Sequence, residues 1–146
     1  MNILVINGPN LNLLGLREPD IYGSQNLQDL ENLLRDYGAK NGISLSFFQS
    51  NHEGAIVDAI QGAFLNADGI IINPAAYTHT SIAILDALKA IGLPAVEVHL
   101  SDITQRESFR RFSYISPACI KTIAGKHFGG YVEAVDVLIN NIHPHT

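Results

Sequence analysis

Residues 69–99 read GIIINPAAYTHTSIAILDALKAIGLPAVEVH, and this stretch decides the fold. Its first part, 69–72, is a short apolar run rich in isoleucine, as in a strand that is covered on both faces of a sheet. Residues 81–91 carry apolar side chains at helical spacing, and the Gly-Leu-Pro that follows at 92–94 is typical of a helix terminus. A second apolar run, 95–99, follows directly. A strand, a helix and a strand with short connections predict a right-handed crossover between parallel strands.

The same alternation extends to both sides of this unit. We expect further strands at 3–6, 43–47 and 119–124, and further helices at 27–37, 56–64 and 131–142. Ser50 or Asn51 is expected to cap the helix at 56–64, and Thr78 or Thr80 the helix at 81–91. Five such strands fit a flavodoxin-like, doubly wound parallel sheet of order 2-1-3-4-5, with helices on both faces. The chain is expected to form a single domain over residues 1–146.

Composition narrows the class of protein. The chain has 146 residues and is 47% hydrophobic, which is enough to bury a core without disulfides or a structural metal. Cys119 is the one cysteine, so a disulfide framework is excluded, and its apolar neighbours favour a buried structural thiol. A net charge of -5 argues against broad nucleic-acid binding. The sequence opens as a core strand with no basic leader and holds no apolar stretch long enough for a bilayer, which predicts a cytoplasmic location.

Three polar segments follow the strands that this order makes neighbours at the centre. They are NGPNLNLLGLREPDIYG at 7–23, NPAAYTHTS at 73–81 and EVHLSDITQRESFRRFS at 97–113. Ligands of open α/β sheets bind beyond the carboxyl ends of the strands, where these segments lie. The first segment is long for a connection of this kind, as lids and binding loops are, and it lacks dinucleotide and triphosphate fingerprints.

Candidate side chains stand out in the second and third segments. Glu97 and His99 are two residues apart on a strand and therefore share a face, so the carboxylate can orient the imidazole; a purely structural ion pair is an equal alternative. Leu100 and Ser101 follow the strand, where free backbone N–H groups can hold a carboxylate. Arg110 can add charge-assisted hydrogen bonds to an anionic ligand. After the third strand, helix capping explains the Thr and Ser residues but leaves Asn73 and His79 unexplained.

The three segments resemble, in order, the signature blocks of the type II 3-dehydroquinate dehydratase family. The resemblance is collinear from the first strand to Pro117. It implies a lyase that needs no cofactor or metal and converts 3-dehydroquinate to 3-dehydroshikimate by anti elimination of water through an enolate, in the shikimate pathway. It also implies a homo-oligomer, in this family a dodecamer built as a tetramer of trimers.

The resemblance further implies a role for each site residue. Tyr22 is the base that removes the proton beside the ketone, and Arg17 favours its phenolate form. Asn10 lies near the developing enolate, and His99, positioned by Glu97, protonates the departing hydroxyl. The residues implied in substrate contacts are Asn73, His79, Leu100, Ser101, Arg110 and, from a neighbouring subunit, Asp86.

Two other classes compete with this interpretation. A flavodoxin-like FMN-binding module would use the same switch point, but the first segment is poor in hydroxyls and the chain contains no tryptophan. A metal hydrolase would use some of the six histidines, but these are scattered and show no recognised ligand spacing. All four lysines lie outside the three segments, so a Schiff base has no obvious donor. Biosynthetic and quinate-catabolic roles stay equally open, because both use one reaction.

Overall fold

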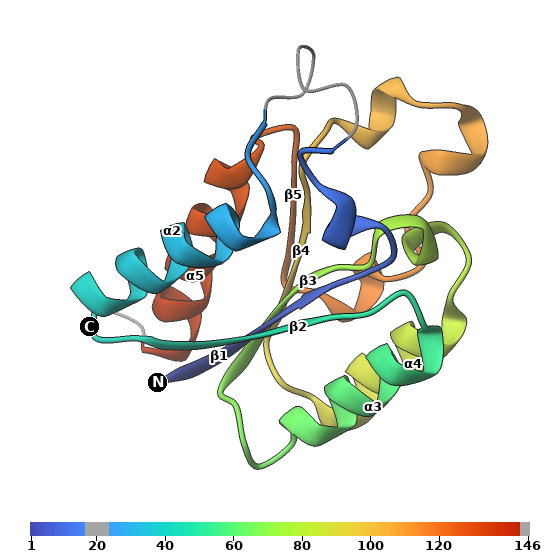
Figure 1. The fold of residues 1–146 in the computed structure, drawn as a ribbon. Coiled ribbons are helices and arrows are strands. Elements are labelled where there is room, and N and C mark those ends of the chain that lie inside the picture. Colours follow the sequence, from blue (N-terminus) through green and yellow to red (C-terminus); the bar gives the residue numbers. More distant parts are fainter. Residues whose placement is uncertain (17–23, 144–146) are drawn as a thin grey trace.

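One parallel sheet organises the chain in this computed structural model, which describes residues 1–16 and 24–143 (Figure 1). The sheet has the strand order β2-β1-β3-β4-β5. Its strands are β1 (Asn2–Asn7), β2 (Ser44–Gln49), β3 (Gly69–Asn73), β4 (Ala95–His99) and β5 (Lys121–Ala124). The predicted fold class and order are confirmed. The fifth strand begins at Lys121 rather than Cys119, because the short 3-10 helix η5 (Ser116–Ala118) turns the chain just before it.

Helices cover both faces of the sheet. Helices α2 (Leu27–Lys40) and α5 (Phe128–Ile142) lie on one face, and α3 (Glu53–Ala63) and α4 (Ile82–Ile91) lie on the other (Figure 1). Each face therefore has its own apolar core, one built on α2 and α5 and one on α3 and α4. Helix α5 begins three residues earlier than the predicted helix at 131–142. Among the described residues, no helix has the length and apolarity needed to cross a membrane.

The predicted helix caps are wrong at two helices. Helix α4 is capped by Ser81, whose side chain accepts a hydrogen bond of 3.0 Å from the Ile84 N–H, so neither Thr78 nor Thr80 is the cap. Thr78 is instead fully buried within the 3-10 helix η2 (Ala75–His79). Helix α3 has His52 at its N-cap position, without a side-chain cap bond. Ser50 lies two residues before this position, and its hydroxyl accepts the His52 N–H rather than an N–H of the helix.

The chain segments that leave β1 and β3 approach each other closely at the switch point. The Gly8 N–H donates to the Asn73 carbonyl at 2.8 Å, which extends the ladder one residue past the strand ends. A Cβ atom on Gly8 would lie 2.4 Å from the Pro74 carbonyl oxygen, far inside van der Waals contact. Glycine is therefore required here because backbone lies against backbone.

We predict that Gly8→Ala lowers the free energy of unfolding by about 1–3 kcal/mol, because a rigid backbone must move to admit the methyl group. Gly62→Ala is the matched control, since a Cβ at that helical position meets nothing within 4 Å. The control should stabilise by roughly 0.5 kcal/mol through the better helix propensity of alanine. Urea denaturation of both variants measures this, and equal effects would contradict the close approach.

Candidate active site

The Glu97 carboxylate is the most enclosed charged group of the site. Glu97 lies in the middle of the register between β4 and β5, beside Thr122, and its side chain is fully buried. The Ser113 hydroxyl donates to it, with distances of 3.0 and 2.9 Å to its two oxygens, and the Thr122 hydroxyl lies 3.4 Å from Oε1. A buried carboxylate without such partners would be strongly unfavourable, so these bonds explain how β4 tolerates Glu97.

His99 completes this arrangement at the carboxyl end of β4. Its Nε2 atom is hydrogen-bonded to Oε2 of Glu97, and the side chain of His99 is only 7% exposed. A carboxylate can only accept, so the Nε2 atom of His99 carries the proton of this bond. Among the described residues, the Nδ1 atom of His99 has no hydrogen-bond partner. The structure thus brings together the two residues predicted to pair.

A buried chain of hydrogen bonds fixes Asn73. The Tyr131 hydroxyl, from α5, donates to Oδ1 of Asn7 at 2.6 Å and accepts from Nδ2 of Asn73 at 3.1 Å. Oδ1 of Asn73 accepts the Ala75 N–H at 3.1 Å, which sets the orientation of the amide. These bonds use one of the two Nδ2 hydrogens of Asn73, and among the described residues the other has no partner. Sequence reasoning missed Asn7 and Tyr131, since a tyrosine in an apolar helical pattern gives no signal of its partners.

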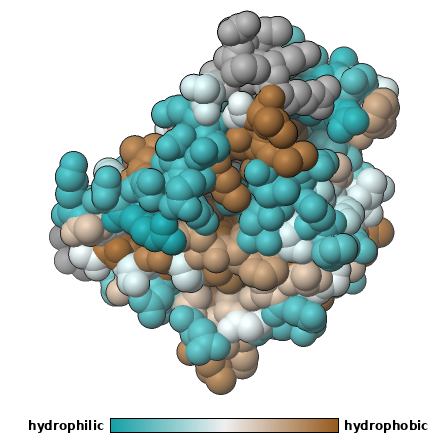
Figure 2. All heavy atoms as spheres, viewed as in Figure 1, coloured by the Kyte–Doolittle hydropathy of each residue, from teal (hydrophilic) through white to brown (hydrophobic). Residues whose placement is uncertain are grey.

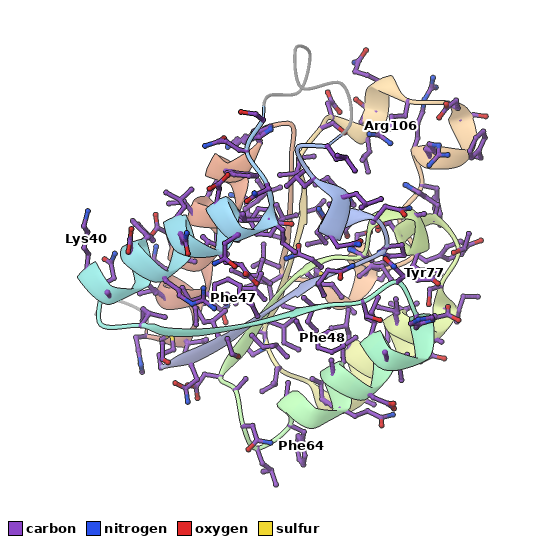
Figure 3. The ribbon with its side chains drawn as sticks, viewed as in Figure 1. Lys40, Phe47, Phe48, Phe64, Tyr77 and Arg106 are labelled. Atoms are coloured by element: carbon purple, nitrogen blue, oxygen red, sulfur yellow. The ribbon has the colours of Figure 1, made fainter. Side chains whose placement is uncertain are left out.

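The loop after β1 is held by residues from the segment that follows β2. Asn10 has a left-handed conformation, with φ of 69°, and its N–H donates to the Asn51 side chain at 3.0 Å. Gln49 donates to the Gly8 carbonyl at 3.1 Å, and the Tyr77 hydroxyl donates to the Asn51 carbonyl at 2.8 Å. Tyr77 comes from η2, so three crossover segments meet here (Figure 3). Asn51 therefore acts in this loop and not in helix capping.

His79 is fixed through its ring by the third segment. Its Nδ1 atom lies 2.8 Å from the Phe112 carbonyl oxygen. A carbonyl only accepts, so Nδ1 of His79 carries the proton of this bond, and among the described residues its Nε2 atom has no hydrogen-bond partner. Thr78 lies next to it, and within the described chain its buried hydroxyl has no hydrogen-bond partner. Its backbone carbonyl accepts the Tyr114 N–H at 2.9 Å.

The other predicted contact residues are engaged elsewhere or lie on the surface. The Ser101 hydroxyl accepts from Arg106, which projects with the loop after β4 (Figure 3), at 3.0 Å. Arg110 forms an exposed ion pair with Glu107, with Nε 3.0 Å from Oε2. The Leu100 carbonyl accepts the His127 N–H at 3.1 Å, and Asp86 is exposed on α4. Tyr22 and Arg17 lie outside the described residues.

Cys119 lies close enough to the site to feel its charge. Burial, with the Glu97 carboxylate as a smaller contribution, raises the pKa of the Cys119 thiol to about 12. A thiolate is the reactive form, so this thiol is inert at neutral pH and not a nucleophile. The expected structural role agrees with this, but Cys119 is half-buried rather than buried as predicted.

The described residues form no metal-binding cluster, and the surface carries two hollows. Across residues 1–16 and 24–143, no group of three or more His, Cys, Asp or Glu side chains could hold a metal ion. One surface hollow lies between β2 and α3, and its lining, which includes Phe48, Ala63 and Ala67, holds no titratable group. A second hollow is lined by residues on either side of 17–23, among them Leu13 and Ser24. The second one adjoins the loop on which the predicted base lies.

Comparison with known proteins identifies the family. The sequence model of the dehydroquinase class II family matches residues 1–139. The chain belongs to the class II dehydroquinase family. It is 53% identical to a 3-dehydroquinate dehydratase of Clostridium acetobutylicum, over 96% of this chain and 97% of that protein. It is also 53% identical to a catabolic 3-dehydroquinase of Emericella nidulans, over 98% and 94% of the two chains.

Solved structures agree with the family assignment. The crystal structure of a type II dehydroquinase from Butyrivibrio crossotus superposes with a TM-score of 0.91, at 50% identity, over 94% of this chain and 97% of that one. The family predicted from the three polar segments is thus confirmed, and a class II dehydroquinase is not expected to be an FMN module. The matched region, residues 1–139, contains all three polar segments, the last of which ends at residue 113.

We predict that Tyr131→Phe destabilises this dehydroquinase by about 1–3 kcal/mol, because Asn7 and Asn73 lose their shared partner in a buried site. Tyr37→Phe is the control, since the Tyr37 hydroxyl bonds to Asp136 at the surface and its loss should cost less than about 1 kcal/mol. Urea denaturation with circular dichroism compares the two.

The pH dependence of stability gives a second readout for the same variant. Burial raises the pKa of the Tyr131 phenol above its ordinary value of 10.0. A raised pKa contributes stability that is present below pH 10.0 and lost as the pH rises further, because the unfolded chain then releases its proton first. The Phe variant should lose this part of the alkaline decline, and an unchanged slope would argue against the buried phenol.

Proposed function

We propose that this chain catalyses the dehydration of 3-dehydroquinate to 3-dehydroshikimate by anti elimination, with residues 1–146 acting as a single catalytic domain. Membership of the class II dehydroquinase family carries this proposal, and the relatives at about 50% identity are named for this activity. The FMN-binding alternative is not favoured. The reaction breaks a C–H bond beside the ketone and a C–O bond to the leaving hydroxyl, and it releases one water.

Proton abstraction is assigned to Tyr22. An unperturbed tyrosine, with a pKa of about 10, is only roughly one part in a thousand phenolate at neutral pH. A nearby guanidinium favours the phenolate, and this is the role of Arg17. The proton leaves the carbon beside the ketone for the phenolate oxygen, and the electron pair of the C–H bond forms the enolate. Asn10 lies beside the developing enolate, where a hydrogen-bonded donor or an ordered water stabilises the negative charge.

Protonation of the leaving group is assigned to His99. The Glu97 carboxylate holds Nε2, so the imidazolium presents its Nδ1–H to the departing hydroxyl. The enolate then expels water and leaves a conjugated enone, and His99 is left neutral. The full burial of Glu97 supports this role, because its carboxylate has no water to bond to and its bond to Nε2 therefore keeps the ring of His99 in one orientation.

Substrate binding is assigned to the remaining predicted residues. The second Nδ2 hydrogen of Asn73 donates to a carboxylate or hydroxyl group, and Nε2 of His79 accepts a hydrogen bond from a hydroxyl group. Backbone N–H groups of Leu100 and Ser101 and the guanidinium of Arg110 complete the contacts with the anion.

An oligomer is proposed with this site. Asp86 is exposed on α4, as required of a residue that acts in a neighbouring subunit. Large hydrophobic side chains stay exposed on the isolated chain, including Leu65 at 86% and Phe109 at 65%, and Figure 2 shows hydrophobic patches between hydrophilic regions on one face. Such surface is typical of subunit contacts. We propose a homododecamer, a tetramer of trimers, located in the cytoplasm.

A single assay tests the activity. Purified protein mixed with 3-dehydroquinate should generate the ultraviolet absorbance of a conjugated enone without added cofactor.

Prolonged treatment with EDTA should leave turnover unchanged. Borohydride added with the substrate should neither inactivate the enzyme nor leave a substrate mass on any lysine. A zinc requirement or a reduced adduct would contradict the mechanism, and lack of turnover would contradict the function.

Tyr22 and Arg17 are predicted to act on one step. Tyr22→Phe removes only the phenolic oxygen, so kcat should fall by several orders of magnitude while circular dichroism shows an intact fold. Arg17→Ala should nearly abolish turnover as well, because the phenolate loses its stabilising charge. The double variant should be scarcely slower than Tyr22→Phe alone, as expected for residues that work as a unit. If Tyr22→Phe keeps most of its activity, Tyr22 is not the base.

A further inference from the structure

Ser113, at the end of the third segment, ties this segment to the sheet through a hydrogen bond to Glu97 on β4. Residues 101–112 leave β4 and carry two short 3-10 helices, η3 (Ile103–Gln105) and η4 (Ser108–Arg110). At the end of this excursion the Ser113 hydroxyl lies 3.0 and 2.9 Å from the two oxygens of Glu97. The two residues are 16 positions apart, so this bond closes the loop at its base.

The orientation of the Ser113 hydroxyl follows from its other bonds. A hydroxyl has one hydrogen to donate and two lone pairs to accept with. The N–H groups of Ile115 and Ser116 both donate to Ser113 Oγ, each at 3.1 Å. Both lone pairs are thereby occupied, and the single hydrogen is directed at the Glu97 carboxylate.

The same short segment also holds the second histidine of the site. The Phe112 carbonyl accepts from Nδ1 of His79, and the Tyr114 N–H donates to the Thr78 carbonyl. Residues 112–114 thus link η2 to the Glu97 carboxylate through three consecutive positions. His79 is oriented directly by this segment, and His99 is oriented through Glu97.

We propose that Ser113 is a positioning residue of the catalytic site, which holds the Glu97 carboxylate in the geometry that orients His99. The proposal rests on the proposed function of His99 as the acid. A directed hydrogen bond to the charged carboxylate stabilises its ionised form and fixes both oxygens, so that one of them always faces the imidazole. Without it, the carboxylate can rotate about its last bond, and the proton on Nδ1 of His99 loses its alignment.

The test compares three variants with the wild-type enzyme. Ser113→Ala removes the donor, Ser113→Thr keeps a hydroxyl, and Ser116→Ala removes a hydroxyl from the same turn that does not contact Glu97. Ser116→Ala also keeps the backbone N–H that Ser113 accepts, which makes it a matched control. For each variant we would measure kcat and KM against pH and titrate the imidazole nitrogens of ¹⁵N-labelled, substrate-free protein by NMR.

In Ser113→Ala we expect kcat to fall about tenfold to 100-fold, with KM changed less, since general acids contribute about 10²–10⁴ to rate. Loss of the donor makes the carboxylate more basic, so the apparent pKa of the coupled Glu97–His99 pair should rise in both the pH profile and the NMR titration. Cys119 also feels the Glu97 charge, but the pKa of its thiol is about 12 and lies outside this range. Ser113→Thr should recover most of the rate, and Ser116→Ala should behave as wild type.

Several outcomes would overturn the proposal. These are a wild-type titration and kcat in Ser113→Ala, an equal loss in Ser116→Ala, or no recovery in a folded Ser113→Thr. Should Ser113→Ala fail to fold, Ser113→Cys fills similar space with a weaker donor and must show the same directions. If the wild-type protein has no turnover but the His99 titration shifts in Ser113→Ala alone, the proposed function fails and the positioning role stands.

Discussion

The burial of one carboxylate constrains most of the candidate site. Glu97 lies on β4 with its side chain fully buried, where an unpaired charge would cost several kcal/mol. Its partners therefore have to be in place whenever the chain is folded, and they come from β4 itself, from β5 and from the end of the loop after β4. A loop of this length would ordinarily be free to vary, but here its far end is tied to the centre of the sheet. The same bonds that make the burial tolerable also orient His99.

A second constraint acts where β1 and β3 end. The approach of Gly8 to Pro74 leaves no room for a side chain, so the loop after β1 starts from a fixed position. Beneath it, Tyr131 bridges Asn7 and Asn73, which are register partners on neighbouring strands. The polar groups at the carboxyl edge are thus held from the α5 side, while Glu97 and His99 are held on β4.

Periodicity predicted the architecture because each element of this chain has a clear pattern. The isoleucine run of β3 and the alternation in β2 are decided by burial, and burial leaves a signal along the sequence. The caps were predicted poorly because Ser50, Asn51 and Thr78 are all polar residues before a helix, and only tertiary contacts decide which of them faces the helix end. The pairing of Glu97 with His99 could be predicted, since two residues fix it. The contacts of Ser113 and Tyr131 could not, because their partners lie 16 and 58 or more positions away.

Two arginines of the third segment, Arg106 and Arg110, already have partners within the chain, but these contacts are weak enough to be exchanged. Arg110 is paired with Glu107, but both side chains are substantially exposed, at 38% and 61%, and such pairs contribute only about 0–1 kcal/mol. An anionic ligand that offers Arg110 a bidentate contact can therefore displace Glu107 at little cost. Arg106 is likewise bonded to a neutral hydroxyl, that of Ser101, which is a weaker acceptor than a carboxylate. The buried hydrogen bonds of Glu97 and Asn73 are therefore costly to break, whereas the contacts of Arg106 and Arg110, on the loop after β4, are readily exchanged. Under the proposed function, a small acid would therefore meet arginines that can change partners without disturbing the bonds of Glu97 or Asn73.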